Sequence, residues 1–143
     1  MTVRRTTIVG NWKMHGLRAS IGEAGVIAAA ASGAPDVDVA LCVPATLIGA
    51  LTAAIPALKV GGQDCHDQPS GAFTGSVSAQ MLADAGAKLV IVGHSERRGP
   101  LGESNELVRA KAMAAIEAGL DVILCVGEPR SVREQAGAEG HVL

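Results

Sequence analysis

The sequence predicts an α/β fold with a parallel sheet, and three observations lead to this prediction. Short apolar runs rich in β-branched residues alternate with longer Ala-rich segments of helical periodicity. Hydrophobic residues make up 48% of the chain but aromatic residues only 1%, so the core is aliphatic, which suits buried parallel strands. Residues 85–91 resemble residues 118–124, an offset of about 33 residues, the size of one strand-plus-helix unit. These patterns leave open whether the sheet is doubly wound or part of a closed barrel.

Each predicted strand is a short apolar run that ends at a glycine or in a polar segment. The five predicted strands span 7–10, 37–43, 58–61, 88–93 and 122–126, and the predicted helices span 20–31, 46–54, 78–85 and 104–118. Ser20 is the predicted N-cap of the first helix, and Gly86 closes the third. On the last helix, the predicted apolar stripe consists of Leu107, Val108, Ala112, Ala115 and Ile116.

Length and charge narrow the class of protein. The 143 residues are enough for one ordinary domain, so we expect residues 1–143 to belong to a single domain. The net charge is −2 without long charge runs, which argues against a nucleic-acid partner. The three cysteines lack CxxC spacing, which favours reduced thiols in the cytoplasm over a disulfide framework or a metal site.

One segment has the length of a membrane span. Residues 39–58 carry no charge, but Pro44 and Pro56 interrupt them, and the segment divides naturally into a strand, a turn and a short helix. We therefore expect no membrane association and a cytoplasmic location.

The most informative stretch is 88–98. Leu89 to Val92 reads as a buried strand, Gly93 ends it, and His94, Ser95, Glu96 and Arg97 follow at once. In parallel α/β folds the carboxyl ends of strands carry ligands and chemistry, although a plain polar turn remains the alternative. Ser95 is a poor nucleophile candidate, because a nucleophile elbow needs glycine where Arg97 stands. No dinucleotide or P-loop glycine motif follows any strand.

Several separated segments together resemble the triosephosphate isomerase family. They are Gly-Asn-Trp-Lys-Met at 10–14, Gly-Ala-Phe-Thr-Gly at 71–75, Val-Gly-His-Ser-Glu-Arg-Arg at 92–98, and Cys-Val-Gly-Glu at 125–128 with Arg-Glu-Gln-Ala-Gly at 133–137. The resemblance implies a (β/α)8 barrel, of which this chain holds about the first five strands as an incomplete barrel. It also implies an isomerase of glycolysis and gluconeogenesis that interconverts dihydroxyacetone phosphate and glyceraldehyde 3-phosphate through an enediolate, without metal or organic cofactor.

The resemblance also implies roles for particular residues. Lys13 would neutralise the substrate's phosphate and developing oxyanion, Asn11 would help to position the substrate, and His94 would polarise the carbonyl. Glu96 would hold Lys13, and Ser95 would hold the resting catalytic base. In a homodimer, Thr74 would reach the partner subunit near its Asn11 and Met14. Cys125 is a supporting residue at the fifth strand, where packing is favoured over direct chemistry.

The family's glutamate base belongs after a sixth strand, and its main phosphate-gripping loops follow the seventh and eighth. We therefore expect the isolated chain to be weakly active or inactive, and prone to association through its open sheet edges. Two alternatives remain. The first is a non-catalytic half-barrel that binds a complementary fragment or a subunit through residues 71–75, and the second is a different phosphate-binding barrel enzyme.

Overall fold

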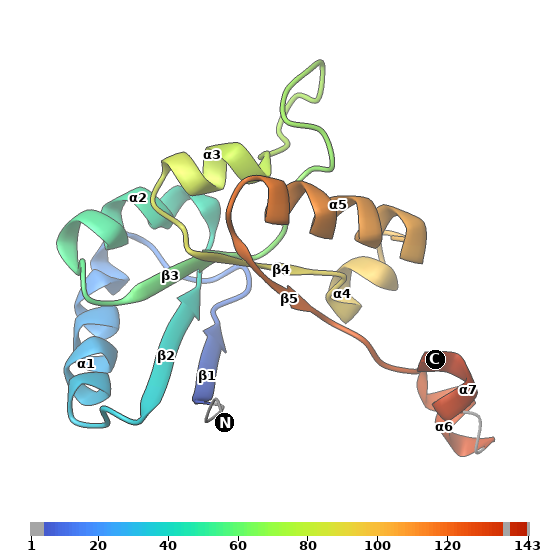
Figure 1. The fold of residues 1–143 in the computed structure, drawn as a ribbon, viewed down its shortest axis with the longest axis horizontal. Helices are drawn as coiled ribbons and strands as arrows, with labels where there is room; N and C mark the ends of the chain where they lie inside the picture. The colour runs from blue at the N-terminus through green and yellow to red at the C-terminus, as the bar shows by residue number, and fades with distance from the viewer. Residues whose placement is uncertain (1–4, 136–137, 143) are drawn as a thin grey trace.

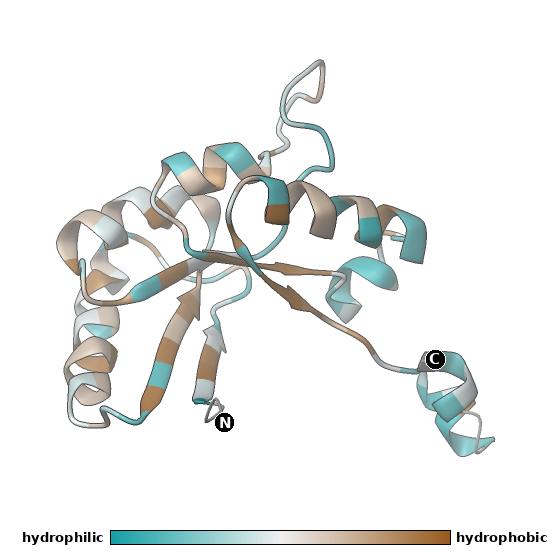
Figure 2. Cartoon of the chain, viewed as in Figure 1, coloured by the Kyte–Doolittle hydropathy of each residue, from teal (hydrophilic) through white to brown (hydrophobic). Residues whose placement is uncertain are grey.

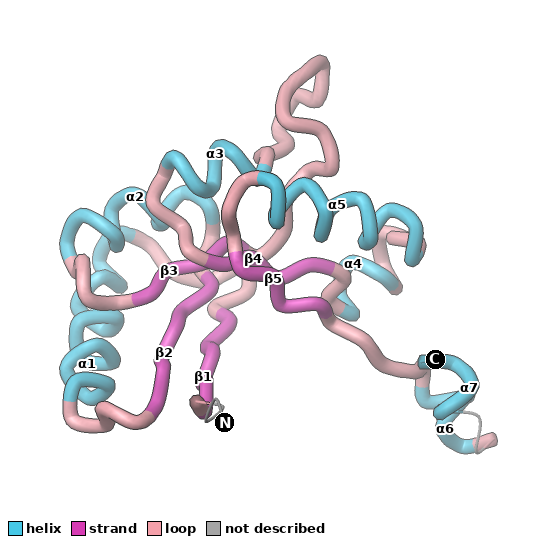
Figure 3. Tube along the Cα trace, viewed as in Figure 1, coloured by secondary structure: helices cyan, strands magenta, loops and turns pink. Residues whose placement is uncertain are grey.

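The structure, a computed structural model, describes residues 5–135 and 138–142 (Figures 1 and 3). The strands are β1 (Thr6–Asn11), β2 (Val37–Cys42), β3 (Lys59–Gly62), β4 (Leu89–Val92) and β5 (Asp121–Leu124). The helices are the 3-10 turn η1 (Arg18–Ser20), α1 (Ile21–Ser32), α2 (Ala45–Ala54), α3 (Ala79–Asp84), α4 (Ser95–Arg98), α5 (Asn105–Glu117), α6 (Arg130–Glu134) and α7 (Ala138–Val142). The five strands and the four longer helices confirm the predicted alternation. The short helices α4, α6 and α7 were not predicted.

The five strands form one parallel sheet in the order β1-β2-β3-β4-β5. The pairing of β1 with β2 runs from Thr6 opposite Val37 to Asn11 opposite Cys42, and the later pairs continue in the same direction. A doubly wound sheet reverses its strand order at a switch point, whereas this order advances steadily, as in a β/α barrel. Helices α1, α2, α3 and α5 all lie on one face of the curved sheet (Figure 1). The fold is therefore an incomplete barrel, and the carboxyl ends of its strands share one rim.

Alternating residues of the strands divide the core into two parts. Leu41 and Val90 face the helices and pack in the larger cluster, whereas their neighbours Cys42 and Leu89 pack on the opposite face, the inside of the barrel. Because both faces of the sheet carry apolar side chains, the strands are mostly hydrophobic, and β4 is apolar throughout, whereas Asp38 interrupts β2 and Lys59 begins β3 (Figure 2). The predicted aliphatic core is confirmed.

The predicted stripe on α5 is wrong in two places. Leu107 and Ile116 are 37% and 57% exposed, and the buried residues of α5 are Val108, Lys111 and Ala115. Val108, Lys111 and Ala115 are spaced as on one face of a regular helix, but one of these buried residues is a lysine. A search for apolar residues alone excludes a lysine, so the predicted face was rotated away from the true one.

The predicted cap of α1 is also only partly right. Ser20 stands at the N-cap position, yet its side chain does not cap the helix. Its hydroxyl instead accepts a hydrogen bond of 3.1 Å from the backbone N–H of Leu17, because the preceding turn η1 brings that N–H close.

Residues 39–58, tested above as a membrane span, form most of β2, all of α2 and the turn before β3. Across residues 5–135 and 138–142, no helix combines the length and the apolar character needed to cross a bilayer.

We expect Gly61→Ala to lower the free energy of unfolding by about 2 kcal/mol, as overpacked substitutions do. A Cβ at Gly61 would lie 2.7 Å from Leu89 Cγ and 2.8 Å from the Leu89 backbone oxygen of the neighbouring strand. The backbone atom cannot move without breaking the sheet. Gly22→Ala is the matched control, because a Cβ at Gly22 in α1 meets nothing within 4 Å. Urea unfolding that finds the two variants equally stable would contradict the close approach of β3 and β4.

Candidate functional site

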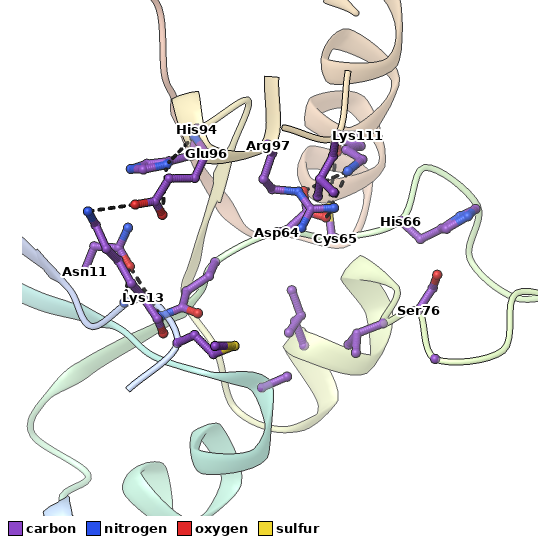
Figure 4. Close-up of a pocket in the computed structure, with 17 residues that line it drawn as sticks. Asn11, Lys13, Asp64, Cys65, His66, Ser76, His94, Glu96, Arg97 and Lys111 are labelled. Atoms are coloured by element: carbon purple, nitrogen blue, oxygen red, sulfur yellow. Dashed lines mark hydrogen bonds and ion pairs between the residues drawn. The ribbon is translucent and has the colours of Figure 1, made fainter. Parts of the chain in front are cut away.

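A cleft of about 590 Å³ lies at the carboxyl ends of the strands (Figure 4). Asn11, the last residue of β1, and Lys13 enter it from one side, and His94 and Glu96 enter it from the segment that follows β4. These residues are about eighty positions apart in the sequence. They meet because parallel strands deliver their carboxyl ends to the same rim.

Lys13 is held at the mouth of the cleft by Glu96. Its Nζ lies 2.9 Å from Glu96 Oε1, and both side chains are about half exposed. The hydrogen bond from Lys13 lowers the pKa of Glu96 below its ordinary value, so Glu96 remains a carboxylate at neutral pH. The pair fixes where the ammonium lies and leaves it open to an anion in the cleft.

His94 is presented by a sharp turn at the end of β4. Gly93 has φ +69°, and a Cβ there would lie 2.7 Å from Val108 Cγ1, so the position needs glycine. His94 is the N-cap of α4, and its Nδ1 accepts a hydrogen bond of 3.2 Å from the backbone N–H of Glu96. An accepting Nδ1 carries no hydrogen, so the neutral ring carries its hydrogen on Nε2. The imidazole is thus arranged to donate an N–H bond to a ligand oxygen.

Four charged side chains, Asp64, Arg97, Glu103 and Lys111, form an ion-pair cluster at the base of the cleft (Figure 4 labels three of them). Lys111 Nζ lies 2.9 Å from both Asp64 oxygens and 2.5 Å from Glu103 Oε1, and Arg97 Nε lies 2.7 Å from the same glutamate oxygen. The side chains of Glu103 and Lys111 are only 4% and 6% exposed. The cluster links α4 to α5 and to the segment after β3. It therefore fixes the position of α4, which carries Glu96 and has His94 as its N-cap.

The two acids of the cluster respond differently to burial. Burial by itself would raise the pKa of Glu103, but its hydrogen bonds from Lys111 and Arg97 outweigh burial and hold that pKa below its ordinary value. Burial raises the pKa of Asp64 in spite of Lys111 and Arg97. Glu103 is therefore the more firmly ionised of the two.

The structure brings together some of the predicted site residues and separates others. Met14 lines the cleft and is 94% exposed. Ser95 and Thr74 are exposed and do not line the cleft, although the residues after Thr74 do. Cys125 lies just beyond β5, outside the cleft lining, and its backbone oxygen accepts a hydrogen bond of 3.3 Å from Arg98.

Sequence reasoning missed Gln63 and the ion-pair cluster. Gln63 follows β3 as Asn11 ends β1, so a polar residue directly after a strand was an available signal. Nothing in the sequence pairs Lys111 with Asp64 and Glu103, because those contacts depend on how α5 packs on the sheet.

His66, which follows Cys65 in the sequence, stacks on Phe73, with ring centroids 4.0 Å apart. In the part of the chain that the structure describes, no three His, Cys, Asp or Glu side chains are grouped to hold a metal ion.

We expect the thiols to react in the order set by their burial. Burial raises the pKa of Cys42 to about 12 and that of Cys65 to about 11, so almost no thiolate forms on either residue near neutral pH. Burial also raises the pKa of Cys125, but this thiol is only partly buried. A short iodoacetamide pulse at about pH 8 should therefore label Cys125 first, as peptide mass spectrometry can read. The same pulse in denaturant should label all three, and native labelling of Cys42 at the rate of Cys125 would contradict the described packing.

A steadily advancing parallel sheet with a lysine and an imidazole at its rim defines a β/α-barrel protein with a polar cleft at the carboxyl ends of its strands. The sequence model of the family described as triosephosphate isomerase matches residues 6–143. Triosephosphate isomerase of Afipia carboxidovorans is 56% identical over 140 residues, which cover 94% of this chain and 55% of the relative. That of Dinoroseobacter shibae is 54% identical over 136 residues, with 94% and 55% covered. The crystal structure of triosephosphate isomerase from Bartonella henselae has a TM-score of 0.93 at 43% identity and covers 96% of this chain and 58% of its own.

The chain belongs to the triosephosphate isomerase family, whose members are isomerases. The expected family and the incomplete barrel are thereby confirmed. The chain spans about half the length of the curated relatives it matches.

Proposed function

We propose that residues 1–143 are the amino-terminal part of a single barrel domain and carry the carbonyl-polarising half of a triosephosphate isomerase site. The reaction interconverts dihydroxyacetone phosphate and glyceraldehyde 3-phosphate in glycolysis and gluconeogenesis, in the cytoplasm. The observation that carries this proposal is that Lys13 and His94 line one cleft, with Glu96 bonded to both segments.

The proposed isomerisation requires fixed hydrogen-bond donors or positive charges at the carbonyl oxygen and at the phosphate of the substrate. When a proton leaves the carbon next to a carbonyl, negative charge develops on the carbonyl oxygen, and preorganised donors stabilise it. His94 Nε2 supplies a directed N–H bond, and Lys13 supplies a compact positive charge for that oxygen and for the phosphate. Asn11 positions the substrate from the end of β1. No step in this scheme calls for a metal or an organic cofactor.

The catalytic base is proposed to come from outside this chain. Asp64 and Glu96 are the carboxylates that line the cleft among the described residues, and both are engaged in ion pairs. Neither is placed to take a proton from carbon while its cation holds it. We therefore propose that the base is the glutamate that the family resemblance places after a sixth strand, with Ser95 holding it at rest. The 143-residue chain alone is then weakly active or inactive.

We further propose that the full-length form is a homodimer. Thr74 lies in an exposed loop that projects away from the barrel (Figure 1), and Met14 is almost fully exposed beside the cleft. An exposed loop and an exposed methionine fit an intersubunit contact in which Thr74 of one subunit approaches Asn11 and Met14 of the other. Cys125 is proposed to act through packing.

A second candidate is binding of a complementary half-barrel without catalysis. Ile8 on β1 is 57% exposed and Leu124 on β5 is 52% exposed, and these strands are the two edges of the sheet. Apolar side chains on open edges favour pairing with another chain.

An isomerase assay on two forms of the protein tests the proposal. One form is the 143-residue chain, and the other, the completed chain, is continued by the carboxyl-terminal half of the Bartonella henselae relative. We expect turnover of triose phosphate by the completed chain and little or none by the 143-residue chain. Equal turnover by both forms would refute the external base, and a soluble, folded but inactive completed chain would favour the binding candidate.

A further inference from the structure

Lys13 is the only residue other than glycine with positive φ among the described residues, at +52°. For a residue other than glycine, the free-energy cost of this left-handed backbone conformation is roughly as large as the contribution of a good hydrogen bond. Surrounding contacts must therefore hold Lys13 in it. The segment from Asn11 to Lys13 is therefore a strained turn, and the strain falls on the residue whose ammonium enters the cleft.

Two side chains fix the peptide groups on either side of Lys13. Asn11 Oδ1 accepts the backbone N–H of Lys13 at 2.8 Å. Gln63 Nε2 donates to the backbone oxygen of Lys13 at 2.7 Å. The orientations of the two flanking peptide groups define φ and ψ of a residue, so these bonds together define the left-handed conformation.

Gln63 is itself anchored by two further acceptors. Its Nε2 lies 3.3 Å from Asn11 Oδ1 and 3.2 Å from the backbone oxygen of Cys42. The Cys42 oxygen also accepts the backbone N–H of Trp12 at 2.9 Å. One amide therefore links the carboxyl ends of β1, β2 and β3 around the strained residue.

We infer that Gln63 is a positioning residue, which holds Lys13 in its left-handed conformation and so aims the ammonium into the cleft. Without the Gln63 amide, the backbone oxygen of Lys13 loses its short bond and the strain is relieved by rotation to negative φ. The ammonium then leaves its place beside Glu96. The conformational part of this inference stands on its own, and the aiming of the ammonium at a triose phosphate rests on the proposed function.

The test is a double-mutant cycle in the completed chain, with Gln63→Met and Lys13→Gly. Glycine adopts positive φ without strain, so Lys13→Gly relieves strain only where Gln63 enforces that conformation. We compare the effect of Lys13→Gly on the unfolding equilibrium constant in two backgrounds, with Gln63 and with Gln63→Met. Relative to its effect in Gln63→Met, the substitution should favour the folded state about five- to thirtyfold more when Gln63 is present, the range that left-handed strain implies. Additive effects would overturn the inference.

A spectroscopic readout separates positioning from a general loss of stability. The backbone carbon shifts and three-bond coupling of Lys13 report its φ, and we expect them to move to values typical of negative φ in Gln63→Met. Gln68→Met is the matched control, because Gln68 is exposed and bonds only to Asp67 through its side-chain amide among the described contacts. Positive φ retained at Lys13 in Gln63→Met would overturn the inference.

If Gln63→Met fails to fold, Gln63→Asn is tested in the same way, since it keeps the amide but is one methylene too short to reach the Lys13 oxygen. In the completed chain, Gln63→Met should lower kcat/KM for triose phosphate about tenfold, through both a higher KM and a lower kcat, because the Lys13 ammonium serves the phosphate and the developing oxyanion. If φ of Lys13 shifts in Gln63→Met but the completed chain with Gln63 has no isomerase activity, the conformational inference is supported and the proposed function is contradicted. If the completed chain with Gln63 is active but φ of Lys13 does not change in Gln63→Met, the proposed function is supported and the conformational inference is contradicted.

Discussion

Lys13→Met in the completed chain should lower kcat/KM for triose phosphate by about 10²- to 10³-fold, the usual effect of removing one preorganised charge from a developing oxyanion. Methionine keeps the length and apolar stem of lysine but removes the ammonium. Because Lys13 is exposed and its ion pair with Glu96 is half exposed, stability should change by less than about 1 kcal/mol. The expected result is therefore a catalytic loss in a folded protein, measured by steady-state kinetics beside urea unfolding.

Lys59→Met is the control for this prediction. Lys59 is exposed and opens β3 at the amino end of the sheet, opposite the rim that carries the cleft. The substitution removes the same charge from the protein, so it tests whether net charge alone accounts for the loss. Comparable losses in the two variants would show that Lys13 has no specific role.

The second large effect is expected at the base of the cleft. Lys111→Met should lower the free energy of unfolding by about 3–5 kcal/mol, because it removes the buried cation that bonds to both carboxylates and leaves them to share Arg97. Lys111 bonds to Asp64 and to Glu103, and Glu103 Oε2 is already buried with no hydrogen-bond partner among the described residues. Lys88→Met, at an exposed position before β4, should have little effect, as measured by urea unfolding.

A further variant distinguishes charge from packing at Lys111. Adding Glu103→Met to Lys111→Met should recover part of the loss, because Arg97 and Asp64 then remain as a pair 2.9 Å apart. If the double variant loses at least as much as Lys111→Met alone, packing and not charge dominates this cluster.

The cluster also fixes how stability depends on acid. The pKa of Glu103 is lowered in the folded protein, so its ionised form contributes stability above the ordinary value of 4.5, and this contribution is lost as the pH falls through the lowered pKa. Glu103→Gln should therefore remove part of the acid-induced loss of stability. Asp64, with its raised pKa, works in the opposite direction and is retained in that variant.

The strands, the four longer helices and the rim could be predicted from the sequence because those signals are local. An apolar run that ends at Gly93, or the polar residues that follow β1, can be recognised without knowing what packs against them. Because parallel strands share a rim, the position of His94 followed from the end of its strand, whereas Asn11 and Lys13 were singled out by the family resemblance.

The features that were missed depend on contacts between distant residues. Burial of Lys111 depends on Asp64, which is 47 positions away, and the role of Gln63 depends on Lys13, which is 50 positions away. The short helix α4 carries no apolar periodicity, although its acidic first turn and basic last turn suit a helix dipole. Composition and spacing carry no record of such pairings, so only the folded arrangement reveals them.

We infer that Lys13 and His94 act on the same small anion, and a nuclear magnetic resonance titration can show whether they do. In the completed chain, the side-chain nitrogen signals of Lys13 and His94 would be followed while 2-phosphoglycolate, a phosphorylated analogue of the enediolate, is added. We expect both signals to shift along one binding curve with a single Kd, while the signal of Lys59 stays unchanged. Two different curves, or a shift at only one of the two residues, would contradict it.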